Sequence, residues 1–227
     1  SLRDSYISLV EAIKHAGGAN LTAVDLKWID SETVTEANVA NKLKDVDGII
    51  IPGGFGERGV EGMIVACKYA RTHALPYLGI CLGMQVTVIE YARDVLGFKD
   101  ATSGEFAHTE HTVIDIMPDK KGKKLGGTMR LGSYPCAVRD GTKIKEAYGS
   151  NLIEERHRHR YEFNNEYREA LENGGLVISG TSPDGHIVET VEVKDHPFFV
   201  GVQFHPEFTS RPENANPIFA AFVKAAL

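Results

Sequence analysis

The sequence predicts an α/β fold, a three-layer sandwich with a mostly parallel central sheet and a smaller antiparallel β element in its second half. In the first half, short apolar runs alternate with helical segments, which is typical of parallel strands joined by right-handed crossovers. In the second half, strand-like stretches follow one another directly. The length of 227 residues, with 42% hydrophobic and 25% charged residues, predicts one domain over residues 1–227 with a continuous core.

The first half shows the alternation most clearly. Val24, Leu26 and Trp28 share one face of an extended segment, and two apolar runs at 47–52 and 76–80 resemble buried parallel strands. Each of these runs precedes a segment with apolar residues at helical spacing. We therefore expect strands at 21–29, 47–52 and 76–80, and helices at 3–16, 59–73 and 82–96, the last closed by Gly97.

The second half is richer in strand patterns. Pro183-Asp184-Gly185 offers hairpin-turn chemistry, and the lysine-rich loop 119–124 is most simply a solvated turn. The predicted strands are 111–117, 125–131, 134–139, 175–180, 186–193 and 198–204, and a last helix begins at about residue 217.

Composition excludes several classes of function. A net charge of −6 and a pI near 5.9 argue against a nucleic-acid surface. No apolar run approaches the roughly 20 residues that span a bilayer, and the polar start of the sequence does not resemble a signal peptide. The three cysteines lack CxxC spacing, so we expect no disulfide or zinc site, no metal ligands, and a reducing, cytoplasmic location.

The most informative stretch is Gly79-Ile80-Cys81-Leu82-Gly83, where a buried strand turns into a helix. This is a cysteine version of the nucleophile elbow, which exposes its side chain at the carboxyl end of the sheet. The helix N-terminus favours a thiolate, and the Leu82 N–H lacks an intrahelical acceptor and can point at an oxyanion. Taken alone, the motif fits a buried cysteine at a tight turn equally well.

A second stretch supplies a base for this thiol. An apolar strand ends in His205-Pro206-Glu207, and residues two apart in an extended chain point the same way. A carboxylate beside an imidazole orients it and stabilises its charged form. A lone His-x-Glu would favour a solvated strand end, but its combination with the cysteine elbow favours catalysis.

The third stretch, Pro52-Gly53-Gly54-Phe55-Gly56, follows a parallel strand at the same edge of the sheet. It lacks the lysine and serine or threonine of a phosphate-binding loop. A second oxyanion donor from the Gly54 N–H fits better, and an ordinary turn remains the alternative.

These three stretches, in this order, resemble class I glutamine amidotransferases. Further segments extend the resemblance to the glutaminase domains of the CTP synthase family over nearly the whole chain. They are PGGFGERGVEGM at 52–63, YLGICLGMQ at 77–85, GGTMRLG at 126–132, ERHRHRYEFNN at 155–165 and VQFHPEFTSRP at 202–212.

The resemblance implies roles for individual residues. Cys81 matches the nucleophile, His205 the base and Glu207 its orienter. Glu105 matches the acid that holds the α-amino group of glutamine, and Arg160 matches the arginine near the glutamine carboxylate. One anion and one cation at these positions agree with charge-assisted recognition of a zwitterion. The remaining substrate-binding positions that it implies are Gly54, Phe55, Leu82, Gly83, Met84 and Gln85.

The family also differs from this sequence. Its members carry a strand directly before the segment that begins here at Leu2, a threonine at the position of Gly104, and a synthetase domain. The resemblance implies no cofactor in the glutaminase part. For the full enzyme it implies ATP and Mg, allosteric activation by GTP, amination of UTP by the synthetase domain, and a homotetramer.

Other functions stay open at this point. The same fold could serve another biosynthetic amidotransferase or a γ-glutamyl hydrolase. A partner swap would distinguish these, because only a CTP synthase synthetase domain should restore glutamine-dependent CTP formation. A non-catalytic regulatory domain is a further alternative, which a glutaminase assay would reveal.

Overall fold

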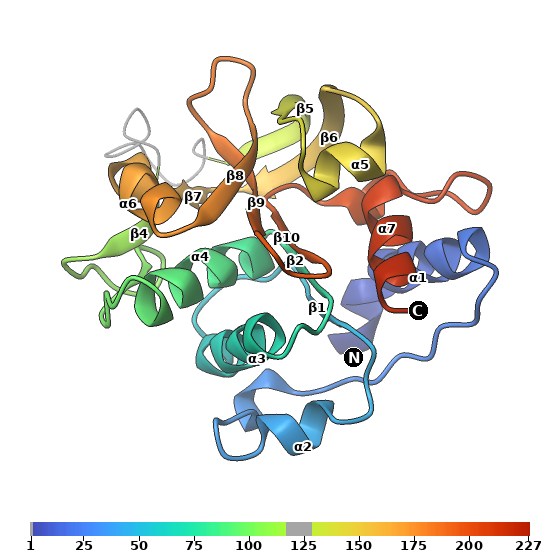
Figure 1. Cartoon of the computed structure of the whole chain (residues 1–227), viewed down its shortest axis with the longest axis horizontal. Helices are drawn as coiled ribbons and strands as arrows, with labels where there is room; N and C mark the ends of the chain where they lie inside the picture. The colour runs from blue at the N-terminus through green and yellow to red at the C-terminus, as the bar shows by residue number, and fades with distance from the viewer. Residues whose placement is uncertain (1, 117–128) are drawn as a thin grey trace.

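The computed structural model describes residues 2–116 and 129–227 (Figure 1). The α-helices are α1 (Ile7–Ala19), α2 (Val39–Leu43), α3 (Val60–Thr72), α4 (Leu82–Asp94), α5 (Lys143–Tyr148), α6 (Arg168–Asn173) and α7 (Pro217–Ala225). The strands are β1 (Ile49–Ile51), β2 (Tyr77–Ile80), β3 (Thr102–Ser103), β4 (Thr112–Ile116), β5 (Arg130–Val138), β6 (Leu152–His159), β7 (Tyr161–Phe163), β8 (Leu176–Thr181), β9 (Val188–Val193) and β10 (Phe199–Val202). Short 3-10 helices span Leu2–Tyr6, Ser31–Thr33, Asn165–Tyr167 and Pro206–Phe208.

Seven strands form the main sheet, in the order β1-β2-β10-β9-β8-β5-β6. The α/β class is confirmed, but the expectation of a mostly parallel sheet is wrong. Only β1–β2 and β2–β10 are parallel pairs, whereas β10–β9, β9–β8, β8–β5 and β5–β6 are antiparallel. The sheet is mixed because β9 pairs with β10, so the antiparallel strands of the second half continue the main sheet instead of forming a separate element.

A second, smaller sheet has the order β3-β4-β7. Its β3–β4 pair is parallel and its β4–β7 pair is antiparallel. The predicted smaller β element is therefore present, with a composition different from the expected one.

Helices cover both faces of the parallel end of the main sheet, which makes the predicted three layers (Figure 1). Side chains from α3 and α4 join one buried cluster, and side chains from α1 and α7 join another. Strand β2 contributes side chains to both clusters, because Tyr77 belongs to the first and Leu78 and Ile80 belong to the second. Burial on both faces explains why β2 is apolar along its whole length.

The expected strand at 21–29 is not formed. Residues 22–30 belong to no helix or strand, and a cavity of about 1240 Å³ separates them from β1. Val24, Leu26 and Trp28 line this cavity together with the β1 residue Ile50. A strand exists only when its N–H and C=O groups pair with a neighbour, and among the described residues this segment has no ladder partner.

Most other predicted elements are confirmed within a few residues. The expected strand at 134–139 is part of a longer strand, β5, which begins at Arg130. The part of the expected strand 125–131 that precedes Met129, and the lysine-rich loop 119–124, lie outside the described residues. The turn Pro183-Asp184-Gly185 joins β8 to β9, with Gly185 at φ +75°.

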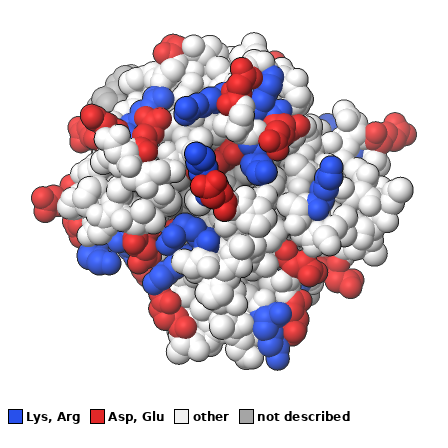
Figure 2. Space-filling view, in the orientation of Figure 1, with Lys and Arg blue, Asp and Glu red and all other residues white. Residues whose placement is uncertain are grey.

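The face of the molecule in Figure 2 carries acidic and basic side chains interspersed over its whole extent. This distribution differs from the continuous basic surface that nucleic-acid binding requires. In the part of the chain that the structure describes, no helix is both long and apolar enough to cross a membrane.

Candidate active site

Cys81 lies between the end of β2 and the start of α4, at the carboxyl end of the parallel strands. Its backbone has φ 52° and ψ −101°, a conformation that a residue with a β-carbon adopts only under strain. The Cys81 N–H donates to the Val202 carbonyl at 2.7 Å, which ties the elbow to the end of β10. This strained turn is the geometry expected of a nucleophile elbow.

Two glycines make the turn possible. A β-carbon on Gly79 would lie 2.5 Å from the Gly83 carbonyl oxygen, and one on Gly83 would lie 2.2 Å from the Ile51 carbonyl oxygen. Both distances are far below van der Waals contact with backbone atoms that cannot move away. The glycines therefore permit the close approach of β1, β2 and α4 that the sequence predicts.

His205 and Glu207 come together just beyond β10. The His205 Nδ1 lies 2.7 Å from the Glu207 Oε1, and the His205 N–H donates to the Arg156 carbonyl at 2.8 Å. The pairing is as predicted, but the expected extended geometry is wrong for Glu207. Pro206 begins a 3-10 helix, Pro206–Phe208, which carries Glu207 beneath the ring and stacks Phe208 against it, with centroids 5.3 Å apart.

The charges around His205 favour its protonated form. Burial alone would lower the pKa of the imidazole, but the nearby Cys81 and Glu207 both favour its charged form and raise its pKa to about 10. Because Glu207 holds Nδ1, the ring nitrogen available to the Cys81 thiol is Nε2. The arrangement suits a thiolate–imidazolium pair.

The glycine-rich loop 52–56 lies against these groups. A β-carbon on Gly53 would be 2.7 Å from the His205 Cε1 and 3.5 Å from the Cys81 Cβ, whereas one on Gly54 would meet only the Leu82 Cδ2, at 3.2 Å. The loop therefore passes directly beside the nucleophile and its base, as its position after β1 predicts. The Phe55 side chain is exposed.

Glu105 and Arg160 both lie close enough to Tyr161 to influence its phenol. Glu105 raises the pKa of the Tyr161 phenol and Arg160 lowers it, although burial is the largest influence on this group. The Gly56 N–H donates to the Glu105 Oε1 at 2.8 Å, so the acid is joined to the glycine-rich loop. Gln85 approaches from α4 and donates its side-chain N–H to the Tyr161 carbonyl at 3.0 Å.

The structure thus gathers most of the predicted substrate-binding residues near the elbow, with two qualifications. The Met84 side chain is fully buried in the core, so this residue can face a ligand only through its backbone. A β-carbon on Gly104 would lie 2.8 Å from the Asp115 Oδ1 and 3.1 Å from the His108 Cε1, so the loop before Glu105 packs closely around a glycine.

Two residues near the nucleophile were not predicted. Gly53 packs on His205, and the fully buried Gln203 places its side-chain Nε2 3.6 Å from the Cys81 Sγ. Gln203 could have been found from its place, because it lies two residues before His205 on an apolar strand and so points to the same side. Gly53 could not, because its neighbours come from distant segments.

A buried polar network lies behind the triad. Glu189 on β9 contacts the Arg130 Nη1 at 2.6 Å and the His157 Nε2 at 2.9 Å, and His157 Nδ1 lies 2.8 Å from His159 Nε2. Burial lowers the pKa of both histidines. The pair His157/His159, which the sequence left without a role, is therefore part of a buried polar network with Glu189 and Arg130.

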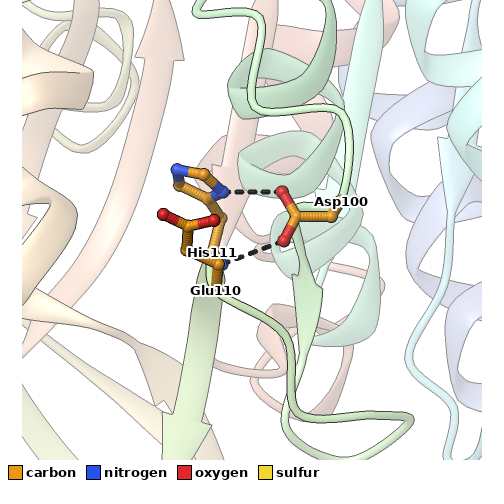
Figure 3. Close-up of side chains that lie close together, drawn as sticks. All are labelled: Asp100, Glu110 and His111. Atoms are coloured by element: carbon orange, nitrogen blue, oxygen red, sulfur yellow. Dashed lines mark hydrogen bonds and ion pairs between the residues drawn. The ribbon is translucent and has the colours of Figure 1, made fainter.

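Asp100, Glu110 and His111 form the one group among the described residues with three side chains close enough to share an ion (Figure 3). The Asp100 carboxylate already accepts from the His111 Nδ1 at 2.6 Å and from the His111 N–H at 3.3 Å. The His111 ring stacks on Phe98, with centroids 4.2 Å apart. These contacts explain why the three side chains lie together, because they connect two neighbouring loops at the surface. Their proximity is the only argument for a bound ion.

Comparisons with known proteins agree on one family. The family model described as "Glutamine amidotransferase class-I" matches residues 1–225. The chain is 58% identical over 228 residues to a CTP synthase of Geobacillus kaustophilus, which covers 100% of this chain and 43% of that protein. It is 59% identical over 228 residues to a CTP synthase of Caldanaerobacter subterraneus, which covers 100% of this chain and 42% of that protein.

A solved structure is similar to this chain over nearly all of its residues. The glutaminase domain of the Trypanosoma brucei CTP synthase, with bound acivicin, superposes with a TM-score of 0.94 at 39% identity, covering 98% of this chain and 88% of that one. The chain spans about two fifths of the length of the curated relatives. It belongs to the class I glutamine amidotransferases, as a glutaminase domain of the CTP synthase family.

Proposed function

We propose that this chain hydrolyses the side-chain amide of L-glutamine through a thioester on Cys81, and that residues 1–227 act as one domain in doing so. The observation that carries the proposal is the strained elbow of Cys81 beside an imidazole that Glu207 holds at 2.7 Å. A buried cysteine without function would gain nothing from this backbone strain or from a charged neighbour.

The chemistry follows from the positions of the groups. The Cys81 thiolate attacks the carboxamide carbon of glutamine, and the N–H groups of Leu82 and Gly54 stabilise the oxyanion. The His205 imidazolium gives its proton to the departing nitrogen, which leaves as ammonia. The neutral imidazole then takes a proton from water, which attacks the thioester and releases glutamate and the thiolate.

Glu105 and Arg160 are proposed to hold the α-amino and α-carboxylate groups of glutamine. Their shared influence on Tyr161 supports this role, because a zwitterion needs one anion and one cation a short distance apart. The backbone of the Leu82–Gln85 turn and the Phe55 region would line the rest of the substrate site.

The activity of a longer protein is a further part of the proposal. By analogy with the named relatives, ammonia would pass to a synthetase domain that aminates UTP with ATP and Mg, under activation by GTP and within a homotetramer. A cytoplasmic location agrees with three free, buried cysteines. Exchange of the synthetase partner would test this, since glutamine-dependent CTP formation should return only with a CTP synthase synthetase domain.

A direct assay tests the glutaminase proposal. Incubation with L-glutamine should release ammonia and glutamate in equal amounts, and γ-glutamyl peptides should be poor substrates. No release from glutamine, alone or with an added synthetase domain and GTP, would favour a regulatory role. Faster release from γ-glutamyl peptides would favour a γ-glutamyl hydrolase.

We expect Arg160→Ala to raise KM for glutamine strongly and to lower kcat slightly. A charge-assisted contact is worth roughly 1.5–3 kcal/mol, or about tenfold to a hundredfold in kcat/KM. Alkylation of Cys81 by iodoacetamide, which lacks an amino-acid head, should barely change. Equal slowing of both reactions would mean that Arg160 shapes the nucleophile instead of binding the substrate.

We expect Gly53→Ala to lower kcat by about a hundredfold, the effect of displacing a catalytic group by roughly 1 Å. The new β-carbon would lie 2.7 Å from the His205 Cε1, so the ring must move. Gly18→Ala on α1, where a β-carbon meets nothing within 4 Å, is the matched control and should keep full turnover. Wild-type kcat in Gly53→Ala would contradict the described position of the imidazole.

The alkaline limb of the kcat/KM profile should have a midpoint near pH 10, where the Cys81–His205 pair loses its proton, since the pKa of His205 is raised to about 10. Glu207 favours the protonated ring, so Glu207→Gln should move this limb to lower pH by about one to two units. An unchanged limb in the variant would show that the carboxylate does not hold the proton on His205.

A further inference from the structure

Gln203 is a fully buried amide immediately after β10, two residues before His205. Its N–H donates to the Glu189 carbonyl at 2.8 Å, which continues the pairing of β10 with β9 by one residue. Its side chain leaves the sheet on the side of the elbow, where Nε2 donates to the Cys81 Sγ at 3.6 Å. Burial without a polar partner would be costly, so each of these contacts matters.

The surrounding hydrogen bonds determine which end of this amide faces the sulfur. The Gln85 Nε2 donates to the Tyr161 carbonyl at 3.0 Å, and a carbonyl can only accept. The same Nε2 also reaches the Gln203 Oε1, at 3.3 Å. The Gln203 oxygen must therefore face Gln85, and its NH₂ group must face the Cys81 sulfur.

We propose that Gln203 is a donor to the nucleophile, whose amide N–H stabilises the Cys81 thiolate and holds the sulfur in place at the elbow. This inference rests on the proposed role of Cys81. The sulfur then has the neutral amide of Gln203 as a donor, in addition to the charge of the nearby His205 imidazolium. A buried anion needs such donors because it has lost its water, and an amide N–H supplies one without titrating.

Gln85 has a part in the same arrangement. With one amide hydrogen on the Tyr161 carbonyl and the other on the Gln203 Oε1, it locks the orientation that presents the Gln203 NH₂ to the sulfur. The strand β7, which carries Tyr161, is thereby connected to the nucleophile through two glutamine side chains in sequence. The adjacent Arg160 lies at the start of that strand, beside the proposed substrate site.

A purely structural role for Gln203 makes a different prediction. A buried amide that only fills space would affect the stability of the fold when replaced, but not the pH at which Cys81 becomes reactive. The pH dependence of alkylation therefore separates the two roles. His205 is coupled to Cys81 and is itself held by Glu207, and both of these titratable groups are unchanged in every variant below.

Two variants test the inference in the whole chain. Gln203→Met keeps the approximate size and removes the N–H. Gln203→Glu keeps the size and the acceptor for Gln85, and turns an oxygen toward the sulfur. Ser179→Ala is the matched control, because it removes a fully buried hydroxyl, paired with Thr190 at 2.7 Å, from strand β8 of the same sheet.

The measurement is the rate of Cys81 alkylation by iodoacetamide as a function of pH, with the thermal unfolding midpoint recorded for each variant. Gln203→Met should move the pH midpoint of alkylation upward by about one unit and slow the reaction about tenfold at pH values below that midpoint. Gln203→Glu should move it further, because a carboxylate then faces the thiolate. Ser179→Ala should lower the unfolding midpoint and leave the alkylation profile unchanged.

A wild-type alkylation profile in folded Gln203→Met or Gln203→Glu would overturn the inference. If Gln203→Met does not fold, Gln203→Glu decides alone, because it preserves the volume and the contact with Gln85. The test is independent of glutamine turnover. If the Gln203 variants have shifted profiles but the wild-type chain releases no ammonia from glutamine, the donor role is supported and the proposed function is refuted. If the wild-type chain is active and the variants have the wild-type profile, the proposed function is supported and the donor role is refuted.

Discussion

Cys81→Ala should lower glutamine turnover by at least about 10⁴-fold while the fold survives. The thiolate forms the thioester, so no other group can replace it in the proposed chemistry. Alanine also has a β-carbon and therefore bears the same strain at φ 52° as cysteine does. Ammonia release and the thermal unfolding midpoint, measured on one preparation, check the two halves of this expectation. Wild-type turnover in the variant would exclude Cys81 as the nucleophile.

The other two cysteines provide controls. Cys67 lies within α3 and Cys136 within β5, and both are fully buried. Burial, with smaller contributions from Glu90 for Cys67 and Glu189 for Cys136, raises the pKa of both thiols far above the usual range. Cys67→Ser and Cys136→Ser should each lose some stability and keep full turnover. Loss of turnover in either folded variant would undermine the assignment to Cys81.

His205→Ala should be the more damaging of two substitutions in the base pair, with a loss of about 10⁶-fold against about 10⁴-fold for Glu207→Gln. The imidazole transfers the proton in both half-reactions, whereas the carboxylate only orients the ring and stabilises its charge. Single-turnover formation of the thioester measures the difference. An equal or larger loss in Glu207→Gln would mean that the carboxylate has a more direct part in proton transfer.

The parallel core of the fold was predictable because local and tertiary signals agree there. The apolar runs at β1 and β2 are each followed by a glycine-containing turn and a helix. This combination is typical of parallel strands joined by helices, so few other arrangements fit the sequence. The elbow was predictable for the same reason, because the contacts that require Gly79 and Gly83 lie between neighbouring elements.

Strand β6 was missed because its buried face is polar. Its residues alternate strictly between exposed and buried, but the inward side chains are Ile153, Glu155, His157 and His159. Glu155 is held by the nearby Tyr148 and by Thr209 and Asn216, and His157 by Glu189, and the last three come from distant segments. A pattern of apolar and polar residues cannot reveal a strand whose inward face is satisfied by hydrogen bonds.

The strand expected at 21–29 failed for the opposite reason. Its alternating pattern is genuine, but a strand requires a neighbour, and the cavity beside β1 separates it from the nearest edge. In the site, the pairing of His205 with Glu207 was predictable from spacing. The same spacing could have placed Gln203 on the side of His205, but its hydrogen bond to Cys81 depends on the pairing of β2 with β10, which a single sequence does not reveal.

The central claim is that glutamine becomes covalently attached to Cys81. Rapid acid quenching during turnover, followed by peptide mapping in a mass spectrometer, measures this directly. The account predicts a glutamyl adduct on the peptide that contains Cys81, at a level that rises when water attack is slowed, and unmodified peptides for Cys67 and Cys136. Turnover with no adduct on Cys81, or an adduct on either of the other cysteines, would contradict it.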